Sequence, residues 1–473
     1  MCVATMNILD LSSELLHEIL LHAVHSRGVA RAARLSLVCK RFRKQLPKAL
    51  FESRLLDDHY TGGLYNGLLI TELWPIRKDY GGLQFWHDYY VYRVRNEQEQ
   101  NGTDPRTGRY VEIREIAEEF NRQTQVDLGH IIDALCWLAM ERWKYPYRST
   151  DKEYVTPNLG LNLLSAATSF DNISLAKRLL SEGHIPTDDN DLFPSPMEIA
   201  ALTGNANMLK IFQESLPEFE ELVPRYSYDT RTWRGKTGPG SIRGAALRGD
   251  LEILRLAIYP PSRAKLNDEY AGKPVGEVVH ETPQGADLKD SLHCCKNSEI
   301  FEYLCSFFEK SSLLEFIDME SLVARYAAMG NVEMVRHLLD AGVKMQGVNN
   351  CNPLHLAAHY GHENIVDLLI ERGIDLGDSD GQARGTPLMA AASSGCMRMV
   401  RKLVDAGARI AEDEELGYAV QLEHTEMANY FMDLYSPHPE NWSRHLVLAE
   451  EEGLESMAQL LRDRGVIIPE ESE

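Results

Sequence analysis

The sequence lacks the long apolar runs and cysteine pairs that mark many membrane and extracellular proteins. No run approaches the about 18 apolar residues of a membrane span, and the beginning, MCVATMNILDLSSELL, has no positive segment before an apolar core. The eight cysteines form no CxxC pair and have no histidine partners at zinc spacing. We therefore expect no secretory signal, no membrane partner, no metal site and reduced thiols, in a protein of the cytoplasm, the nucleus or both.

The sequence also lacks a recognisable catalytic set. It contains no HExxH. Gly235, Lys236 and Thr237 resemble the end of a phosphate-binding loop, but that motif needs a glycine five residues before its Gly-Lys pair, where Thr230 stands. We therefore expect no catalytic residues, no cofactor and a protein that is not an enzyme. A nucleotide-binding enzyme is an alternative that this tripeptide alone supports.

Positive charge is scarce outside the N-terminus. The chain has 49 Lys and Arg against 71 Asp and Glu, a formal net charge of −22. This excess disfavours nucleic acid as a partner and suits a basic or neutral protein. Residues 1–60 contain nine Lys or Arg and six Asp or Glu, which leaves 40 minus 65, or −25, for the remainder. The basic character is therefore local.

A repeated pattern dominates the second half of the chain. It stands as NPLHLAAHYGHENIVDLLIERGIDL from Asn352 and as TPLMAAASSGCMRMVRKLVDAGARI from Thr386. The turn glycines Gly361 and Gly395 are 34 residues apart, and a fixed period of this length indicates a stacked repeat. Each copy has a capping residue followed by proline, which predicts a helix start. A second helix with an apolar stripe follows and needs neighbours to bury it.

This pattern resembles the ankyrin repeat, in which PLHLAA and GHENIVDLLIERG have the same places. The resemblance implies an all-α array that binds other proteins. We count about nine repeats within residues 158–473, several of them degenerate. They cover the stretches 161–183, 195–212, 242–258, 290–308, 323–342, 352–376, 386–410, 416–435 and 445–465.

Two insertions interrupt the period, near residues 213–240 and 259–289. Insertions in repeat arrays form loops on one face, which is often the binding face. The first insertion is rich in residue types that are frequent in protein interfaces. The candidate target-binding residues are Arg225, Tyr226, Tyr228, Arg231, Trp233 and Arg234. The alternative is a loop without a ligand.

The N-terminal segment, residues 9–55, predicts two or three short helices. Ser12 or Ser13 precedes a helix with an apolar stripe at helical spacing. After a break at Gly28 we expect a second helix, which carries Leu35, Val38, Cys39 and Phe42. So few residues cannot bury a core unaided, and an external partner is expected.

This segment resembles an F-box, through LxxELLxxIL followed by LSLVCKRFR. In that family the apolar face docks onto the Skp-type linker subunit of a cullin–RING ubiquitin ligase. The resemblance carries this role over to Leu11, Leu15, Leu16, Ile19, Leu20, Leu35, Val38, Cys39 and Phe42. Two features depart from the family: serine replaces the usual proline at position 12, and the connector from His22 to Arg34 is long and Arg-rich. The alternative is an amphipathic cap that folds back on the rest of the chain.

The predicted architecture has three parts. Residues 1–55 form the F-box-like domain, residues 56–157 a helical connector that caps the array, and residues 158–473 the ankyrin array. Within the connector we expect helices over 111–123 and 128–143. This order resembles the fungal F-box/ankyrin proteins. It implies a substrate receptor of an SCF-type ubiquitin ligase, in which the array binds the target. The alternative is an ankyrin scaffold with no ligase link.

Overall fold

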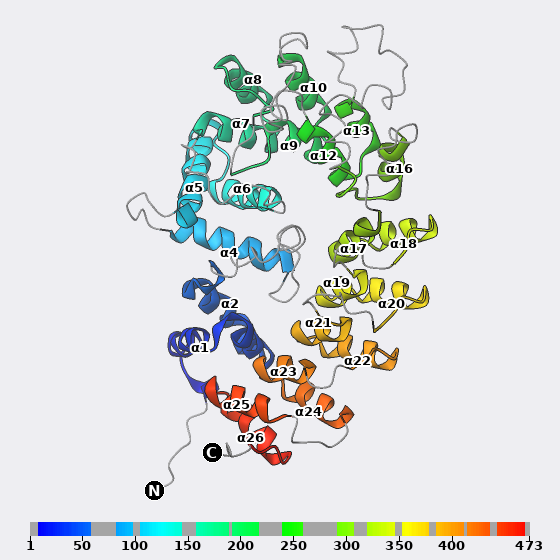
Figure 1. Cartoon of the computed structure of the whole chain (residues 1–473). Coiled ribbons are helices and arrows are strands. Elements are labelled where there is room, and N and C mark those ends of the chain that lie inside the picture. Colours follow the sequence, from blue (N-terminus) through cyan, green and yellow to red (C-terminus); the bar gives the residue numbers. More distant parts are fainter. Residues whose placement is uncertain are drawn as a thin grey trace. The chain divides into compact units, whose positions relative to one another are not determined.

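The computed structural model of the chain is all-α (Figure 1). Within the part that it describes, every regular element is an α-helix or a 3-10 helix. The fold class predicted from the sequence is therefore confirmed. The described residues are 8–57, 82–97, 105–143, 158–188, 192–216, 239–258, 291–306, 319–345, 352–377, 385–410, 414–435 and 442–468.

Residues 8–57, called the N-terminal module below, contain two longer helices and two short ones. They are η1 (Ile8–Asp10), α1 (Ser13–Ala33), η2 (Arg34–Leu37) and α2 (Lys40–Ser53). Ser12 caps α1 by accepting a hydrogen bond from the Leu15 N–H. The predicted break at Gly28 is confirmed: its φ of 71° and ψ of 172° are not helical, so α1 consists of two helical segments that meet at a kink there.

The next helix begins later than the sequence predicts. The expected helix through Leu35 and Phe42 is wrong, because Cys39 has extended backbone angles (φ −161°, ψ 166°). Its Sγ accepts a hydrogen bond from the Phe42 N–H and so caps α2, which begins at Lys40. A cysteine cap therefore separates η2 from α2.

The interior of the N-terminal module lies where α1 contacts α2. Leu16, Leu20 and Val24 follow one another at intervals of four residues on α1 and are fully buried. On α2, Phe42 and Leu46 are also buried. Helical spacing places such residues on one stripe, which explains why the two helices pack. His17 Nε2 lies 2.5 Å from the Glu52 carboxylate and joins the same two helices.

Three helices follow, namely α4 (Gly82–Asn96), α5 (Pro105–Thr124) and α6 (Leu128–Trp143). The two helices predicted here are confirmed as α5 and α6. Ile113, Ile116 and Phe120 are fully buried on the predicted face of α5. Since α5 contacts both α6 and the first helix of the next segment, α7, it covers the beginning of the repeats.

Helices then occur in pairs. In residues 158–306 the structure describes α7 (Leu159–Ser169) with α8 (Ile173–Ser181), α9 (Pro196–Thr203) with α10 (Ala206–Ser215), α12 (Pro239–Arg248) with α13 (Leu251–Ile258), and α16 (Ser298–Ser306). The first helices stack directly, because α9 contacts both α7 and α12. Cys294 and Cys295, just before α16, are buried.

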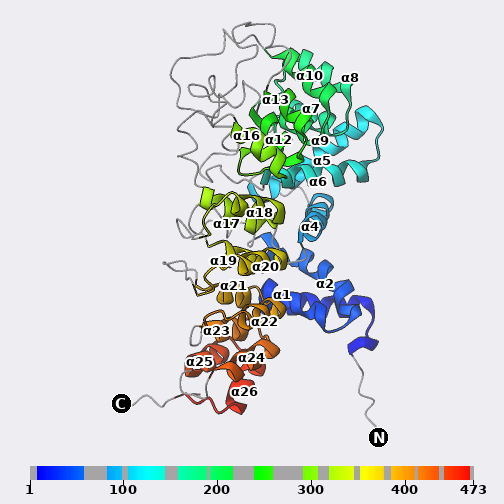
Figure 2. The same cartoon turned by 90° about the vertical axis from the view of Figure 1, so that its right-hand side faces the viewer.

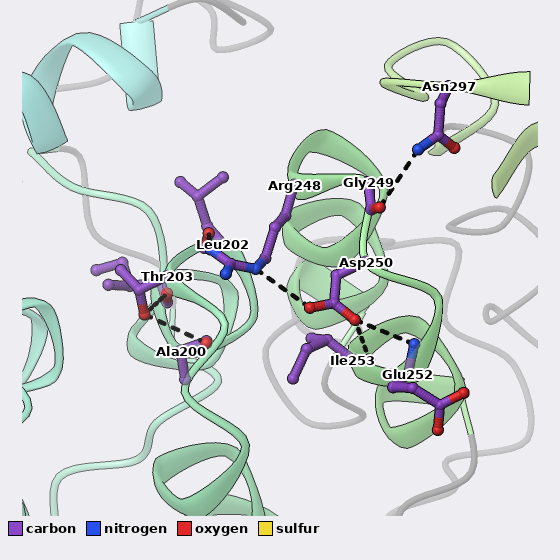
Figure 3. A network of polar contacts seen from close by, with 10 residues as sticks. Ala200, Leu202, Thr203, Arg248, Gly249, Asp250, Glu252, Ile253 and Asn297 are labelled. Carbon is purple, nitrogen blue, oxygen red and sulfur yellow. Dashed lines mark hydrogen bonds and ion pairs between the residues drawn. The ribbon is translucent and has the colours of Figure 1, made fainter. Parts of the chain in front are cut away.

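The tight turns inside the pairs are bonded to neighbouring repeats (Figure 3). Asp250 Oδ1 accepts from the N–H groups of Glu252 and Ile253, both at 3.1 Å, and so caps α13. The Arg248 guanidinium donates to the Leu202 carbonyl oxygen at 3.3 Å. Asn297 Nδ2 donates to the Gly249 carbonyl oxygen at 3.3 Å. The turn at 248–250 therefore contacts the repeats before and after it and also caps its own second helix.

Five further pairs follow one another in chain order (Figure 2). They are α17 (Met319–Met329) with α18 (Val332–Asp340), α19 (Pro353–His359) with α20 (Glu363–Glu371), α21 (Pro387–Ser393) with α22 (Met397–Asp405), α23 (Glu414–Gln421) with α24 (Thr425–Leu434), and α25 (Ser443–Glu451) with α26 (Glu455–Asp463). Here α21 contacts α19 and α23, and α23 contacts α25. The alanines in these first helices are buried, which lets the helices approach closely.

The chain divides into two compact units that do not follow sequence order. One comprises residues 1–85 and 323–473, and the other comprises residues 86–322. The N-terminal module therefore shares a unit with the C-terminal repeats. The division into three consecutive domains stays a prediction. In the described part of the chain, no helix is long and apolar enough to cross a membrane.

Candidate protein-binding surface on the N-terminal module

Three of the nine predicted linker-binding side chains are exposed on the N-terminal module. Leu15 is 56% exposed, Ile19 40% and Val38 64%. Leu15 and Ile19 lie one turn apart on α1, and Val38 follows η2, which contacts α1. These three residues are called the apolar face below. Single exposed aliphatic side chains are ordinary, and these three are a candidate interface because the F-box resemblance assigns them to linker binding.

The other six predicted residues support this face from within. Leu16, Leu20 and Phe42 are buried between the helices. Leu11, Leu35 and Cys39 are half-buried. Together they hold the helices that display the apolar face, so a direct role in binding remains a prediction for them.

Arginines at the other end of α1 contact the C-terminal repeats, and α1 lies beside α23 and α25 (Figure 1). Arg27 forms an ion pair with Glu423, and the Arg31 guanidinium lies 2.7 Å from the Glu452 carboxylate. Arg34 is half-buried at the end of α1. Its burial lowers its pKa, while the Glu423 carboxylate acts in the opposite direction.

The alternative of a cap that folds back on the rest of the chain allows for this contact, but the sequence did not identify the residues that make it. The Arg-rich connector from His22 to Arg34 was noted only as a departure from the F-box pattern. The charge excess in residues 1–60 was a signal, but the acidic partners are 396 and 421 residues away in the chain. Nothing local in the sequence identifies them.

The predicted target-binding residues lie outside the described residues. This holds for Arg225, Tyr226, Tyr228, Arg231, Trp233 and Arg234, and also for Gly235, Lys236 and Thr237. Two of the grooves in the described part are open and shallow. One is lined by Glu112, Glu115, Ile116, Glu118, Glu119, Arg122 and Leu159, and the other by Leu339, Val343, Lys344, Met345, Arg372, Gly373, Ile374 and Asp375.

Catalytic and metal chemistry find little support in the described part of the chain. No group of three His, Cys, Asp or Glu side chains there is placed to hold a metal ion. The letters GDSDG at 377–381 match GxSxG, a pattern that sequence reasoning overlooked. That motif acts in a turn from a strand to a helix. Helix α20 and a turn precede Gly377, and the other four residues, 378–381, lie outside the described residues.

Comparison with known proteins identifies the repeats. A family model described as ankyrin repeats (3 copies) matches residues 291–380 and 323–414. Rabbit (Oryctolagus cuniculus) "Ankyrin repeat and SOCS box protein 5" is 38% identical over 86 residues, which is 17% of this chain and 26% of that protein. Mouse (Mus musculus) "Ankyrin repeat and SAM domain-containing protein 6" is 33% identical over 93 residues, 19% of this chain and 10% of that protein.

A third relative is the Caenorhabditis elegans "E3 ubiquitin-protein ligase hecd-1", which is 38% identical over 65 residues, or 13% of this chain and 2% of that protein. The chain thus spans about a quarter or less of these relatives. Residues 291–414 are ankyrin repeats, a protein-binding module. The match does not include residues 9–55, so the F-box resemblance stays a prediction.

Proposed function

We propose that this chain is a substrate-receptor subunit of an SCF-type cullin–RING ubiquitin ligase. The apolar face of the N-terminal module docks onto the Skp-type linker, and the ankyrin array binds a target protein. The observation that carries the proposal is the exposure of Leu15, Ile19 and Val38 on a module whose other predicted residues are partly or fully buried. One relative is named for ankyrin repeats and a SOCS box, and another is named as an E3 ubiquitin-protein ligase.

The energetics of the apolar face suit a partner of this kind. Covering three half-exposed aliphatic side chains contributes roughly 2–4 kcal/mol. That is one part of a stable interface, and linker docking covers backbone and polar groups besides. The receptor performs no chemistry of its own. It raises the effective concentration of the target near the ubiquitin-conjugating enzyme.

The alternative function is an ankyrin scaffold in which the N-terminal module only caps the array. The contacts of Arg27 and Arg31 with the C-terminal repeats favour that alternative. They involve the arginine-bearing end of α1, however, and leave Leu15 and Ile19 exposed. A segment that only capped the array would gain no stability from aliphatic side chains left in water.

The test is binding of the purified full-length protein to a purified Skp-type linker. We expect Leu15→Asp with Ile19→Asp to weaken binding by roughly 100-fold or more, because two carboxylates are then desolvated in an apolar interface. The helix content of this variant, measured by circular dichroism, should equal that of the wild type, since both side chains face solvent.

The matched control is Leu16→Asp with Leu20→Asp, one position further along the same helix. These side chains are fully buried, so this variant should lose thermal stability as well as binding. Absence of linker binding by the folded wild-type protein would leave the scaffold function. Unfolding of the Leu15/Ile19 variant would mean that the apolar face is internal.

A further inference from the structure

One backbone position recurs in the turn between the two helices of each repeat and has a positive φ. Glycine, which has no Cβ, adopts such angles readily, whereas other residues are strained there. Glycine occupies the position in six of the described repeats, as Gly204, Gly249, Gly330, Gly361, Gly395 and Gly453. Two repeats depart from this rule: Asp171 and Glu423 both have a φ of 51°.

Both exceptions have a carboxylate that reaches another element. The Asp171 carboxylate accepts a hydrogen bond from Asn205 Nδ2 at 2.5 Å, in the corresponding turn of the next repeat. The Glu423 carboxylate forms its ion pair with Arg27 on α1. A strained residue persists where its surroundings hold it. At both positions, therefore, a contact made by the side chain accompanies the strain.

Each of the two ion pairs has one partner that is well covered and one that is open to water. In the first pair the Glu423 side chain is 12% exposed and that of Arg27 is 44% exposed, and in the second pair Arg31 is 23% exposed and Glu452 is 47% exposed. Single pairs at exposed sites contribute little, so the contribution here depends on several charges acting together. The half-buried Arg34 adds a third cation near Glu423. His424, the next residue, is half-buried too, and Arg34 is one of the charges that act on it.

The ion pair of Arg31 with Glu452 joins α1 to the next repeat in the same way. Glu452 directly precedes Gly453, in the turn between α25 and α26, just as Glu423 lies in the turn between α23 and α24. Arg27 and Arg31 thus contact two successive turns. The kink at Gly28 lies between the two arginines, and a Cβ there would meet no atom within 4 Å. Glycine is therefore suited to position 28 because of the positive φ of the kink, and not because another atom lies close to it.

We propose that the arginine-bearing end of α1 is a built docking surface whose partner is the turns of the last two repeats of the same chain. Glu423 is its anchor, in a position that otherwise holds glycine. The docked state leaves Leu15, Ile19 and Val38 uncovered, so the repeats present the apolar face in one fixed orientation. Only this last consequence rests on the proposed function.

The first experiment compares hydrogen exchange of full-length wild type and Glu423→Gly. Glycine relieves the strain at φ 51° and removes the carboxylate. We expect amides in residues 22–34 to exchange roughly threefold to tenfold faster, while α24 and the thermal midpoint are unchanged or improved. If Glu423 only forms the turn, its replacement should not change hydrogen exchange in α1. Unchanged exchange in residues 22–34 therefore overturns the proposal.

The second experiment reverses the charges. Arg27→Glu and Glu423→Arg should each loosen residues 22–34, and the double variant should restore most of the protection, since the pair is then re-formed with opposite sign. Arg43→Glu, an exposed position on α2, is the matched control and should leave α1 unchanged. Failure of the double variant to recover contradicts a direct pairing.

These measurements need no linker, so they separate the two proposals. If the wild-type protein does not bind the linker but Glu423→Gly loosens α1, the docking surface stands and the ligase function fails. If the linker binds and α1 is insensitive to all four variants, the ligase function stands and the docking surface fails.

Discussion

At the scale of single residues, His424 combines a structural role with a pH-dependent one. It precedes α24, and its Nδ1 accepts a hydrogen bond from the Met427 N–H at 3.4 Å. Only an unprotonated nitrogen can accept. Burial, together with the Arg34 charge, lowers the pKa of His424 from 6.5 to about 4.

This shift predicts a loss of stability in mild acid. The unfolded chain binds a proton below pH 6.5 and the folded chain only near pH 4, so stability is full above 6.5 and falls as the pH decreases between these values. Because His424 is only half-buried, we expect about 1–2 kcal/mol after allowance for solvent screening. Urea unfolding at pH 7 and pH 5 measures it.

The control is His424→Asn. In two other repeats the corresponding capping residue is an asparagine, Asn205 or Asn331. Its side-chain oxygen accepts a hydrogen bond from a backbone N–H and does not titrate in this pH range. This variant should retain its stability at pH 7 and lose that part of the pH dependence. An unaltered difference between the two pH values would assign the effect to other groups.

Residue-level prediction from the sequence had a definite limit in the N-terminal module. The apolar pattern of α1 includes both Leu15 and Leu16, which are adjacent. Consecutive helix residues are about 100° apart, so both fit a broad apolar stripe. The position of α2 decides that Leu16 is buried while Leu15 remains exposed. The apolar pattern alone therefore does not tell which of the two side chains is exposed.

At the scale of elements, the first helices of the repeats depend on small side chains. Ala391 is fully buried in α21, which contacts both α19 and α23. We expect Ala391→Leu to destabilise the protein by about 1–3 kcal/mol, because the added methyl groups force the stacked helices apart. Chemical denaturation measures the change. Leu substitution at Arg398, an exposed position on α22, is the control and should be nearly neutral.

Elements were the best-predicted level. The capping residue and proline before α19 and α21 gave the starts of those helices, because their stereochemistry acts locally. The N-terminal module was predicted less well, since a 3-10 turn and the Cys39 cap replaced an expected continuous helix. The repeat over 416–435 also departs from the repeat pattern, because Glu423 stands where most of the described repeats have glycine.

At the scale of the whole molecule, the two proposed contacts of α1 have opposite physical character. The arginines of α1 bind the repeats through ion pairs, whereas the apolar face would bind the linker through hydrophobic contacts. Raising salt from 0.1 M to 1 M shortens the screening length from about 10 Å to about 3 Å. We therefore expect faster hydrogen exchange in residues 22–34 at high salt, with linker affinity nearly unchanged. A linker affinity that falls as steeply as α1 protection would mean that the contacts are not separate.

The sequence could not predict that the N-terminal module and the C-terminal repeats belong to one compact unit. Periodicity and capping report on neighbours within about ten residues, while the pairing of Arg27 with Glu423 spans 396 residues. A single acidic side chain at the end of a chain with a net charge of −22 gives no sign of its partner. Only the folded backbone brings the two together.

That separation also sets an order of events during synthesis. A ribosome adds about 5–20 residues per second, so the 396 residues between Arg27 and Glu423 take about 20–80 s to translate. Throughout that interval the nascent α1 has its arginines unmatched and its aliphatic side chains in water. A chain that stops before Glu423 lacks the acidic partner of Arg27. A truncation near the C-terminus should therefore loosen the arginine-bearing end of α1.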